Sequence, residues 1–358
     1  MAQNVLFMSA QPYMPQMFGG MQSTTHQLTQ ALTDRGYDVS ILAALMPNGW
    51  IGWRGRVLLK ALRKKAIADR YESYPVYRAW GPWDAVSETV TAVKPDVAVV
   101  SVKNPVKIAK ALQENGVPIL LDLKDVEFDT LGGDLSELSH LHAVANSQFT
   151  ADKYHEAFGL KSTVIHPLVD KDRYRVESER KYVTFINTNA LKGLDIALGV
   201  ARLCPDIEFE FVETWPLKPD ELSALNESLA SLPNVTFTRV QKDVRVIYRR
   251  SRLVLAPSQW EEAFGRVGLE PQISGIPVVA SQIGGLPEAV GEGGILIDPK
   301  APAEVWAEEI KALCADQTRY EALSQKAISH SQGQAFDNHH QIGLWAEMIE
   351  RAGRSSRG

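Results

Sequence analysis

Cysteine is scarce in this chain, and it lacks both an excess of positive charge and any long apolar run. Only Cys204 and Cys314 occur in 358 residues, so we expect a reducing compartment and no disulfide framework. The formal net charge of −5 disfavours a general nucleic-acid binder, which usually carries a basic excess. No apolar run approaches the roughly 18 residues of a membrane span. The first residues also lack the basic and then apolar pattern of a signal peptide.

Apolar runs alternate with segments of helical periodicity, and they are frequent enough to build a full core. Hydrophobic residues make up 45% and charged residues 23% of the sequence, as in ordinary soluble globular proteins. Residues 5–8 form an unbroken apolar run, a loop with Gly19 and Gly20 follows, and residues 22–35 have one apolar helical face. Strand, glycine loop, helix and strand open a βαβ unit, which predicts parallel sheets covered on both faces.

The alternation of strands and helices occurs as two series, separated by a polar stretch at residues 170–181. At roughly 100–200 residues per domain, two domains are expected. We therefore predict an α/β protein with two Rossmann-like domains, one over residues 1–168 and one over residues 169–334. A last helix is expected from residue 335 on, before a polar tail.

The segment PSQWEEAFGRVGLE, from Pro257 to Glu270, gathers carboxylates and glycines. Pro271 favours a helix that begins near it, because proline is tolerated only in the first helical turn. Glu262 would then lie in the preceding loop and Glu270 in the first turns of the helix. Carboxylates accept hydrogen bonds from paired hydroxyls, and a helix N-terminus beside Gly265 can approach a phosphate. The alternative is that Glu262 and Glu270 are solvated acids that bind no ligand.

This segment, with SGIPVVAS and GGLPE after it, resembles the donor-site signature of the family 4 retaining glycosyltransferases, which have the GT-B fold. The resemblance covers most of the chain and is sharpest from residue 254 to residue 299. It implies an α/β GT-B architecture in which the parallel sheets of two Rossmann-like domains face an interdomain cleft. It also implies that the last helix, within residues 335–358, crosses back to the first domain.

The resemblance assigns roles to matched positions of the second domain. Glu270 is expected to hold the ribose hydroxyls of a nucleotide-sugar donor. Glu262 is expected to contact hydroxyls of the transferred sugar. The backbone N–H groups around Phe264, Gly265 and Arg266 are expected to line the sugar and the phosphates.

Three further positions resemble phosphate-binding positions of the family. Lys192 matches a lysine that binds the donor pyrophosphate as a point charge. Most members carry an arginine a few residues earlier; this chain has the tripeptide NTN there, and Asn187 is the candidate that replaces it. In the first domain, Gly19 and Gly20 resemble a glycine loop whose amides meet the donor phosphate across the cleft. A surface lysine and an ordinary turn are the alternatives.

Lys124 and Asp125 follow the strand expected at residues 117–122, where ligand-facing residues gather in such sheets. Many family members have a histidine in place of Lys124. Lys124 or Asp125 is expected to contact the sugar or the acceptor, and Asp125, with Glu127, could serve an acceptor hydroxyl as base. A solvated loop is the alternative. The predicted catalytic set is Glu262, Lys192, Lys124 and Asp125.

The resemblance implies a retaining transferase of the hexosyl type, which is expected to move a sugar from a nucleotide-sugar to a glycan, lipid-linked or small-molecule acceptor in polysaccharide biosynthesis. No metal is expected, because H-x-x-x-H, C-x-x-C and a D-x-D of the metal-bound transferase type are absent. No other cofactor and no nucleic-acid partner are expected, and the predicted location is the cytoplasm. One alternative is a non-catalytic GT-B-fold partner or nucleotide-binding subunit, and the other is a sugar-nucleotide epimerase on the same architecture.

Residues 50–70, WIGWRGRVLLKALRKKAIADR, concentrate arginine and lysine beside two tryptophans. A basic amphipathic helix with tryptophans can lie on an anionic membrane surface. The segment therefore predicts a helix that makes peripheral contact with the inner face of the membrane. A solvated helix over the first domain is the alternative.

Overall fold

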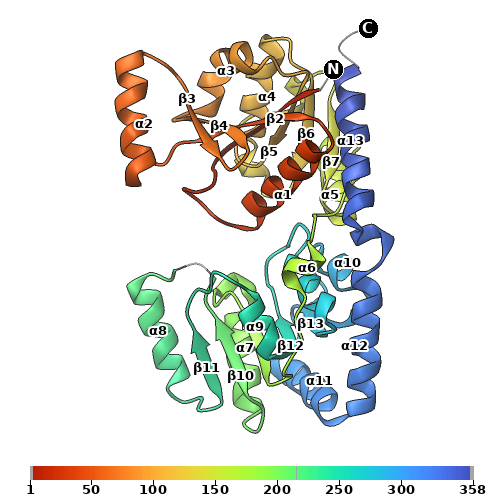
Figure 1. The fold of residues 1–358 in the computed structure, drawn as a ribbon. Coiled ribbons are helices and arrows are strands. Elements are labelled where there is room, and N and C mark those ends of the chain that lie inside the picture. Colours follow the sequence, from red (N-terminus) through yellow and green to blue (C-terminus); the bar gives the residue numbers. More distant parts are fainter. Residues whose placement is uncertain (1–2, 215, 355–358) are drawn as a thin grey trace. The chain divides into compact units, whose positions relative to one another are not determined.

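The computed structural model describes residues 3–214 and 216–354, and these form two compact units (Figure 1). Unit 1 consists of the chain up to Leu168 together with the chain from Asn338 on. Unit 2 runs from Val169 to Asp337. Each unit is an α/β fold built on one sheet. The α/β prediction is therefore confirmed.

The sheet of unit 1 has the strand order β3-β4-β2-β1-β5-β6-β7-β8. Its neighbouring strands are parallel, as predicted, except for the antiparallel pair β3 and β4 at one edge. The strands are β1 (Asn4–Pro12), β2 (Asp38–Ala44), β3 (Ile67–Tyr71), β4 (Tyr74–Ala79), β5 (Val97–Ser101), β6 (Ile119–Leu123), β7 (His142–Ala145) and β8 (Thr163–Val164). The central strands are apolar along their length because both of their faces are covered.

Helices pack on both faces of this sheet, and one of them, α2 (Gly49–Leu62), lies beyond its edge (Figure 1). The others are α1 (Gly20–Asp34), α3 (Val86–Val93), α4 (Pro105–Glu114), α5 (Gln148–Phe158) and α13 (Asn338–Arg354), with short 3₁₀ turns at η1 (Pro82–Ala85), η2 (Phe128–Leu131) and η3 (Leu135–Glu137). Residues of α1 and α13 join one apolar core, and residues of α3, α4 and α5 join the core on the other face. The last helix of the chain therefore completes unit 1.

Unit 2 repeats the plan with the order β11-β10-β9-β12-β13-β14, all parallel. Its strands are β9 (Tyr182–Ile186), β10 (Phe209–Val212), β11 (Val235–Thr238), β12 (Ser251–Ala256), β13 (Val278–Ser281) and β14 (Gly294–Ile297). Its helices are α6 (Lys171–Tyr174), α7 (Leu194–Leu203), α8 (Pro219–Leu229), α9 (Arg245–Arg250), α10 (Leu286–Val290), α11 (Ala303–Ala315) and α12 (Gln317–Ser331). Its 3₁₀ turns are η4 (Ala190–Lys192), η5 (Arg266–Gly268), η6 (Glu270–Ser274), η7 (Gly291–Gly293) and η8 (Gln334–Phe336).

Strand order marks one place in each sheet where a ligand is expected. In unit 1, β1 lies between β2 and β5, and in unit 2, β9 lies between β10 and β12. The strand order therefore reverses its direction at β1 and at β9. Ligands of open α/β sheets bind outside the carboxyl ends of the strands at such switch points. The loops that follow β1, β9 and β12 carry the glycines, the lysine and the glutamates singled out in the sequence.

Two helices predicted from the sequence differ in the structure. The helix expected at residues 269–274 is the 3₁₀ turn η6, which Gly275 ends in a left-handed conformation. The helix expected over residues 50–70 ends at Leu62, since Arg63 adopts φ 50°. The chain then enters β3, whose Ile67 is buried. In the described ranges, no helix is both long and apolar enough to cross a membrane.

Candidate functional site

A tight turn after β9 presents Lys192 beside the loop that follows β12. Asn187 opens the turn with φ 75° and donates its backbone N–H to the Val212 carbonyl at 2.9 Å. The Asn189 side chain accepts the Leu191 N–H at 2.9 Å and so starts η4. A Cβ at Gly193 would collide with the Pro257 carbonyl oxygen. Close packing of the two backbones therefore fixes the base of Lys192.

The predicted Lys192 and Glu262 lie together. The ammonium of Lys192 forms an ion pair with Oε1 of Glu262, and both side chains are partly buried. The Ser258 hydroxyl lies 3.4 Å from the same carboxylate oxygen. A cation for phosphate and a carboxylate that can accept hydrogen bonds from sugar hydroxyls thus lie beyond the carboxyl ends of β9 and β12.

Two consecutive glycines hold the loop of Glu262 from behind. The Gly285 N–H donates to the Glu262 carbonyl at 2.6 Å. A Cβ at Gly284, where φ is 60°, would lie 2.5 Å from that same oxygen. Any larger residue would push the Glu262 loop out of place, so these glycines position the carboxylate.

Glu270 belongs to a second group of polar side chains, distinct from the Lys192–Glu262 pair. Nε of Arg266 donates to Oε1 of Glu270 at 2.7 Å, and the Tyr248 hydroxyl donates to Oε2 at 2.9 Å. Nη2 of Arg266 also donates to the Tyr174 hydroxyl at 2.7 Å. Burial, with the nearby Glu270 charge, raises the pKa of Tyr248 and of Tyr174, so both phenols remain donors. The carboxylate is thereby oriented and keeps lone pairs for further donors.

Sequence patterns did not reveal Tyr174 and Tyr248 as members of this group. Tyr174 ends α6 and Tyr248 lies in α9, far along the chain from Glu270. Neither residue stands in a motif, because their shared position depends on how α6 and α9 pack on the sheet. The approach of long-range side chains is not encoded in local spacing.

The loop residues between the two glutamates have mainly structural side chains. The Phe264 ring is buried and packs on Phe336, with ring centroids 6.0 Å apart. A Cβ at Gly265, where φ is 83°, would lie 2.6 Å from Leu286. Any ligand contact at Phe264 and Gly265 would therefore come from the backbone, as the sequence predicts.

In unit 1, Gly19 and Gly20 begin α1 after the loop that leaves β1. Gly19 is the N-cap residue in an extended conformation, and a Cβ there would lie 2.9 Å from the Gln22 amide oxygen. Gln22 in turn donates to the Pro12 carbonyl at 3.1 Å. A 15-residue helix that starts with glycines offers backbone N–H groups to an anion.

Lys124 is held at the end of β6 by a buried acid. Its ammonium lies 2.6 Å from Oδ2 of Asp122, and the two side chains are only 10% and 3% exposed. It also donates to the Thr25 hydroxyl at 3.4 Å. Burial raises the pKa of Asp122, and the charge of Lys124 opposes that rise. Asp122, two residues before Lys124 in the sequence, therefore fixes the lysine at the end of β6.

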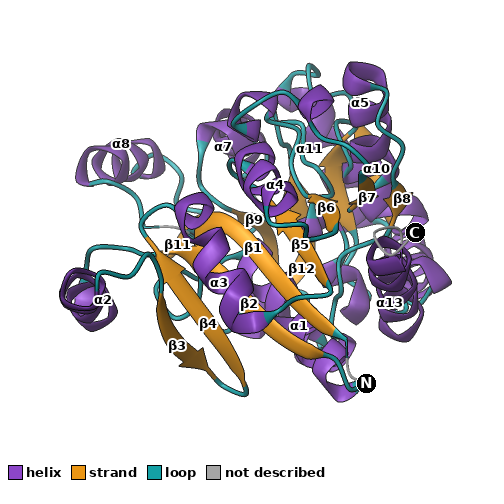
Figure 2. Cartoon of the chain, turned by 90° about the horizontal axis from the view of Figure 1, so that it is seen from above, coloured by secondary structure: helices purple, strands orange, loops and turns teal. Residues whose placement is uncertain are grey.

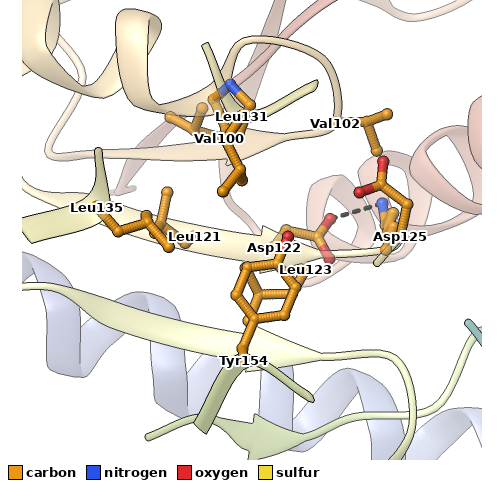
Figure 3. Close-up of a pocket in the computed structure, with 11 residues that line it drawn as sticks. Val100, Val102, Leu121, Asp122, Leu123, Asp125, Leu131, Leu135 and Tyr154 are labelled. Atoms are coloured by element: carbon orange, nitrogen blue, oxygen red, sulfur yellow. Dashed lines mark ion pairs between the residues drawn. The ribbon is translucent and has the colours of Figure 1, made fainter. Parts of the chain in front are cut away.

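Asp125 is a predicted catalytic residue whose carboxyl group is buried enough to shift its pKa. Burial, reinforced by the charge of Glu127, raises its pKa to about 6. Asp122, Asp125 and Tyr154 line a cavity of about 10 Å³, room for roughly one water (Figure 3). A carboxylate with a pKa near 6 is ionised at neutral pH and can accept a proton from a hydroxyl.

No group of three or more His, Cys, Asp or Glu side chains suited to a metal ion occurs in the part of the chain that the structure describes.

The second half of the chain matches a known family. Residues 170–330 match the model of the "Glycosyl transferases group 1" family. The D-inositol 3-phosphate glycosyltransferase of Segniliparus rotundus is 33% identical over 215 residues, which are 52% of this chain and 47% of that protein. The protein of the same name from Rhodococcus jostii is 38% identical over 225 residues, 54% of this chain and 49% of that protein. The chain spans about half the length of these relatives.

Solved structures resemble the whole fold. The match to a glycosyltransferase from Rickettsia africae covers 98% of this chain and 98% of that chain, with a TM-score of 0.76 and 16% identity. Anabaena Alr3699/HepE in complex with UDP-glucose covers 97% of this chain and 99% of its own, with a TM-score of 0.74 and 20% identity. At these identities the likeness establishes the fold.

The protein has the GT-B fold of these glycosyltransferase structures. Residues 170–330, nearly all of unit 2, match the group 1 glycosyltransferase family. The predicted resemblance is confirmed at the level of group 1, and membership of family 4 stays a prediction.

Proposed function

We propose that this protein is a retaining glycosyltransferase of the hexosyl type, which moves a sugar from a nucleotide-sugar donor to a hydroxyl acceptor. The observation that carries the proposal is the Lys192–Glu262 ion pair at the carboxyl ends of β9 and β12. A donor brings a diphosphate for the lysine and sugar hydroxyls for the glutamate. The Glu270 carboxylate, oriented by Arg266 and Tyr248, is assigned to the ribose hydroxyls.

In this proposal the bond between the anomeric carbon and the diphosphate oxygen breaks while the acceptor oxygen bonds the same face of that carbon. Lys192 stabilises the negative charge that develops on the leaving diphosphate. The backbone N–H groups around Gly265 and Arg266, with Asn187, assist it. The acceptor proton passes to a basic oxygen at the site, and no metal or other cofactor takes part.

Residues of unit 1 are assigned to bind the acceptor and to make further contacts with the donor phosphates. Gly19 and Gly20 offer the α1 N-terminus to the phosphates, and Lys124 and Asp125 contact the sugar or the acceptor. We infer a glycan, lipid-linked or small-molecule acceptor in polysaccharide biosynthesis. The reaction is placed in the cytoplasm, at the inner face of the membrane for a lipid-linked acceptor.

A thermal-shift panel of UDP-, GDP-, ADP-, CMP- and dTDP-sugars tests the donor role. A ligand at 100 times its Kd should stabilise the fold by about 2.7 kcal/mol. Lys192→Gln should reduce the shift with the matching nucleotide-sugar and leave the smaller shift with the bare nucleoside unchanged. If none of these nucleotide-sugars shifts the melting temperature, the donor site is refuted and a non-catalytic partner subunit is favoured.

Product analysis then separates the remaining alternatives. Proton NMR of the product should show the anomeric configuration of the donor, and a chelator should leave the rate unchanged. Conversion of the nucleotide-sugar to its epimer without any acceptor would instead identify an epimerase.

A further inference from the structure

Helix α2 is attached to unit 1 along one narrow side. Gly52, Gly55 and Leu59 are its buried residues. A Cβ at Gly55 would lie 2.6 Å from the Leu45 side chain, and Leu45, Leu59 and Ile67 form a small apolar cluster. The glycines let the helix lie close to the sheet edge, beyond β3 and β4, where it stands apart from the other helices of its unit (Figures 1 and 2).

The opposite side of α2 is apolar and exposed. Trp50, Trp53 and Val57 are 70%, 56% and 46% exposed. With Ala61 they share an arc of about 80° at 100° per residue, roughly opposite Leu59. The two indole rings stack with centroids 5.1 Å apart. A helix that packs one side on a soluble protein normally shows a polar side to solvent, so this apolar side calls for a partner.

Cations flank the exposed arc and continue past its end. The segment 49–66 contains Arg54, Arg56, Lys60, Arg63, Lys64 and Lys65 and no acid, in a chain whose formal net charge is −5. Lys64 lies 4.0 Å from Glu88. Among the described residues, Arg54, Arg56, Lys60 and Arg63 form no ion pair. The local field is therefore strongly positive on the side that exposes the tryptophans.

We propose that the exposed side of α2 docks on the surface of an anionic lipid bilayer. The indoles and Val57 enter the headgroup region, and the flanking cations contact lipid phosphates. This docking surface consists of residues 50–63 and excludes β3, so it is shorter than the segment expected from the sequence. It requires no donor or acceptor and stands or falls independently of glycosyl transfer.

Charge favours a bilayer over a second copy of this chain. Two copies that met through α2 would bring two sets of cations together with no acid in either segment. An anionic bilayer supplies both an apolar layer for the tryptophans and negative charge for the arginines and lysines.

Co-sedimentation of the full chain with vesicles tests this surface. Equal mixtures of phosphatidylcholine and phosphatidylglycerol should bind the protein, and phosphatidylcholine alone should bind at least tenfold more weakly. Replacing Arg54, Arg56 and Lys60 by glutamine should weaken binding to the anionic vesicles by tenfold or more, since each cation near such a surface contributes about fivefold. Trp50→Ser with Trp53→Ser should weaken it comparably.

Matched controls use residues outside α2. Trp80→Ser removes another exposed tryptophan, and Lys94→Gln, Lys161→Gln and Lys242→Gln together remove three exposed lysines; both controls should bind the vesicles like wild type. Equal binding of the α2 variants and wild type, or equal binding to neutral and anionic vesicles, would overturn the proposal. So would self-association of the protein without lipid that Trp50→Ser with Trp53→Ser abolishes, which identifies a second copy as the occupant.

Discussion

At the scale of single residues, charges at the candidate donor site are paired within the protein itself: Lys192 with Glu262, and Arg266 with Glu270. Such pairing holds each side chain in one place before a ligand arrives, which lowers the cost of ordering it on binding. Local motifs single out Lys192, Glu262 and Glu270, and the roles of these residues toward a donor stay predictions. Their partners Tyr174 and Tyr248 could not be predicted, because those contacts join residues far apart in sequence.

Removal of the Glu270 charge should weaken nucleotide binding specifically through the ribose. Glu270→Gln keeps an acceptor for Tyr248 but loses a charge-assisted hydrogen bond to the sugar hydroxyls, worth about 1.5–3 kcal/mol. Titration calorimetry should show a nucleotide Kd roughly 10 to 100 times higher. A 2′,3′-dideoxy nucleotide should bind the variant and wild type equally. A dideoxy nucleotide that also loses affinity would point to general damage instead.

Asp125 should make stability depend on pH in a direction that its burial sets. Its pKa is raised to about 6, so the folded protein binds the proton more tightly than the unfolded chain. Ionisation therefore lowers the free energy of unfolding, beginning near pH 4 and complete above about pH 6. Asp125→Asn should be more stable than wild type at pH 8, by up to about 3 kcal/mol, and similar at pH 3.5. An equal difference at both pH values would identify a packing effect, as urea unfolding would show.

At the scale of elements, the sequence predicted strands best where burial on both faces makes them continuously apolar, as in residues 5–8 of β1. It missed β3 and β4 at the edge of unit 1, where Arg78 is fully buried. The Arg78 guanidinium bonds Asp69 at 3.0 Å and the carbonyls of Tyr13 and Met14. A buried charge satisfied by distant groups leaves no apolar pattern to recognise.

Gly193→Ala should lower the free energy of unfolding more than Gly116→Ala, because the two glycines differ mainly in how closely other atoms surround them. Gly193 and Gly116 have φ of 84° and 68°, but a Cβ would collide with the Pro257 carbonyl only at Gly193. Gly116→Ala should cost about 1 kcal/mol through backbone strain alone. Gly193→Ala should add overpacking and cost about 2–4 kcal/mol in total. Calorimetric unfolding of both variants would show the difference, and equal costs would mean that the η4 turn is not tightly held.

At the scale of the whole molecule, unit 1 is built from two separate stretches of chain. Helix α13 contributes Trp345, Met348 and Ile349 to the same apolar core as α1. The Gln341 side chain accepts the His166 N–H at 3.0 Å, so α13 begins close to where the first stretch ends. The motif-bearing residues Lys192, Glu262 and Glu270 all belong to unit 2, which is one continuous stretch.

Division of the chain should therefore affect the two units differently. Fragment 169–337 should fold and bind a nucleotide with an affinity set by Glu270 and Lys192. Fragment 1–168 should be unstable, because loss of α13 exposes the side of its sheet that Trp345 and Ile349 cover. Exposure of apolar surface to water costs about 25 cal/mol per Å². Joining residue 168 to residue 338 through a short glycine-serine linker should restore cooperative unfolding of unit 1, followed by circular dichroism. If fragment 1–168 alone unfolds as cooperatively as the linked form, α13 is only a surface attachment; if fragment 169–337 folds without binding nucleotide, the donor site needs residues of unit 1.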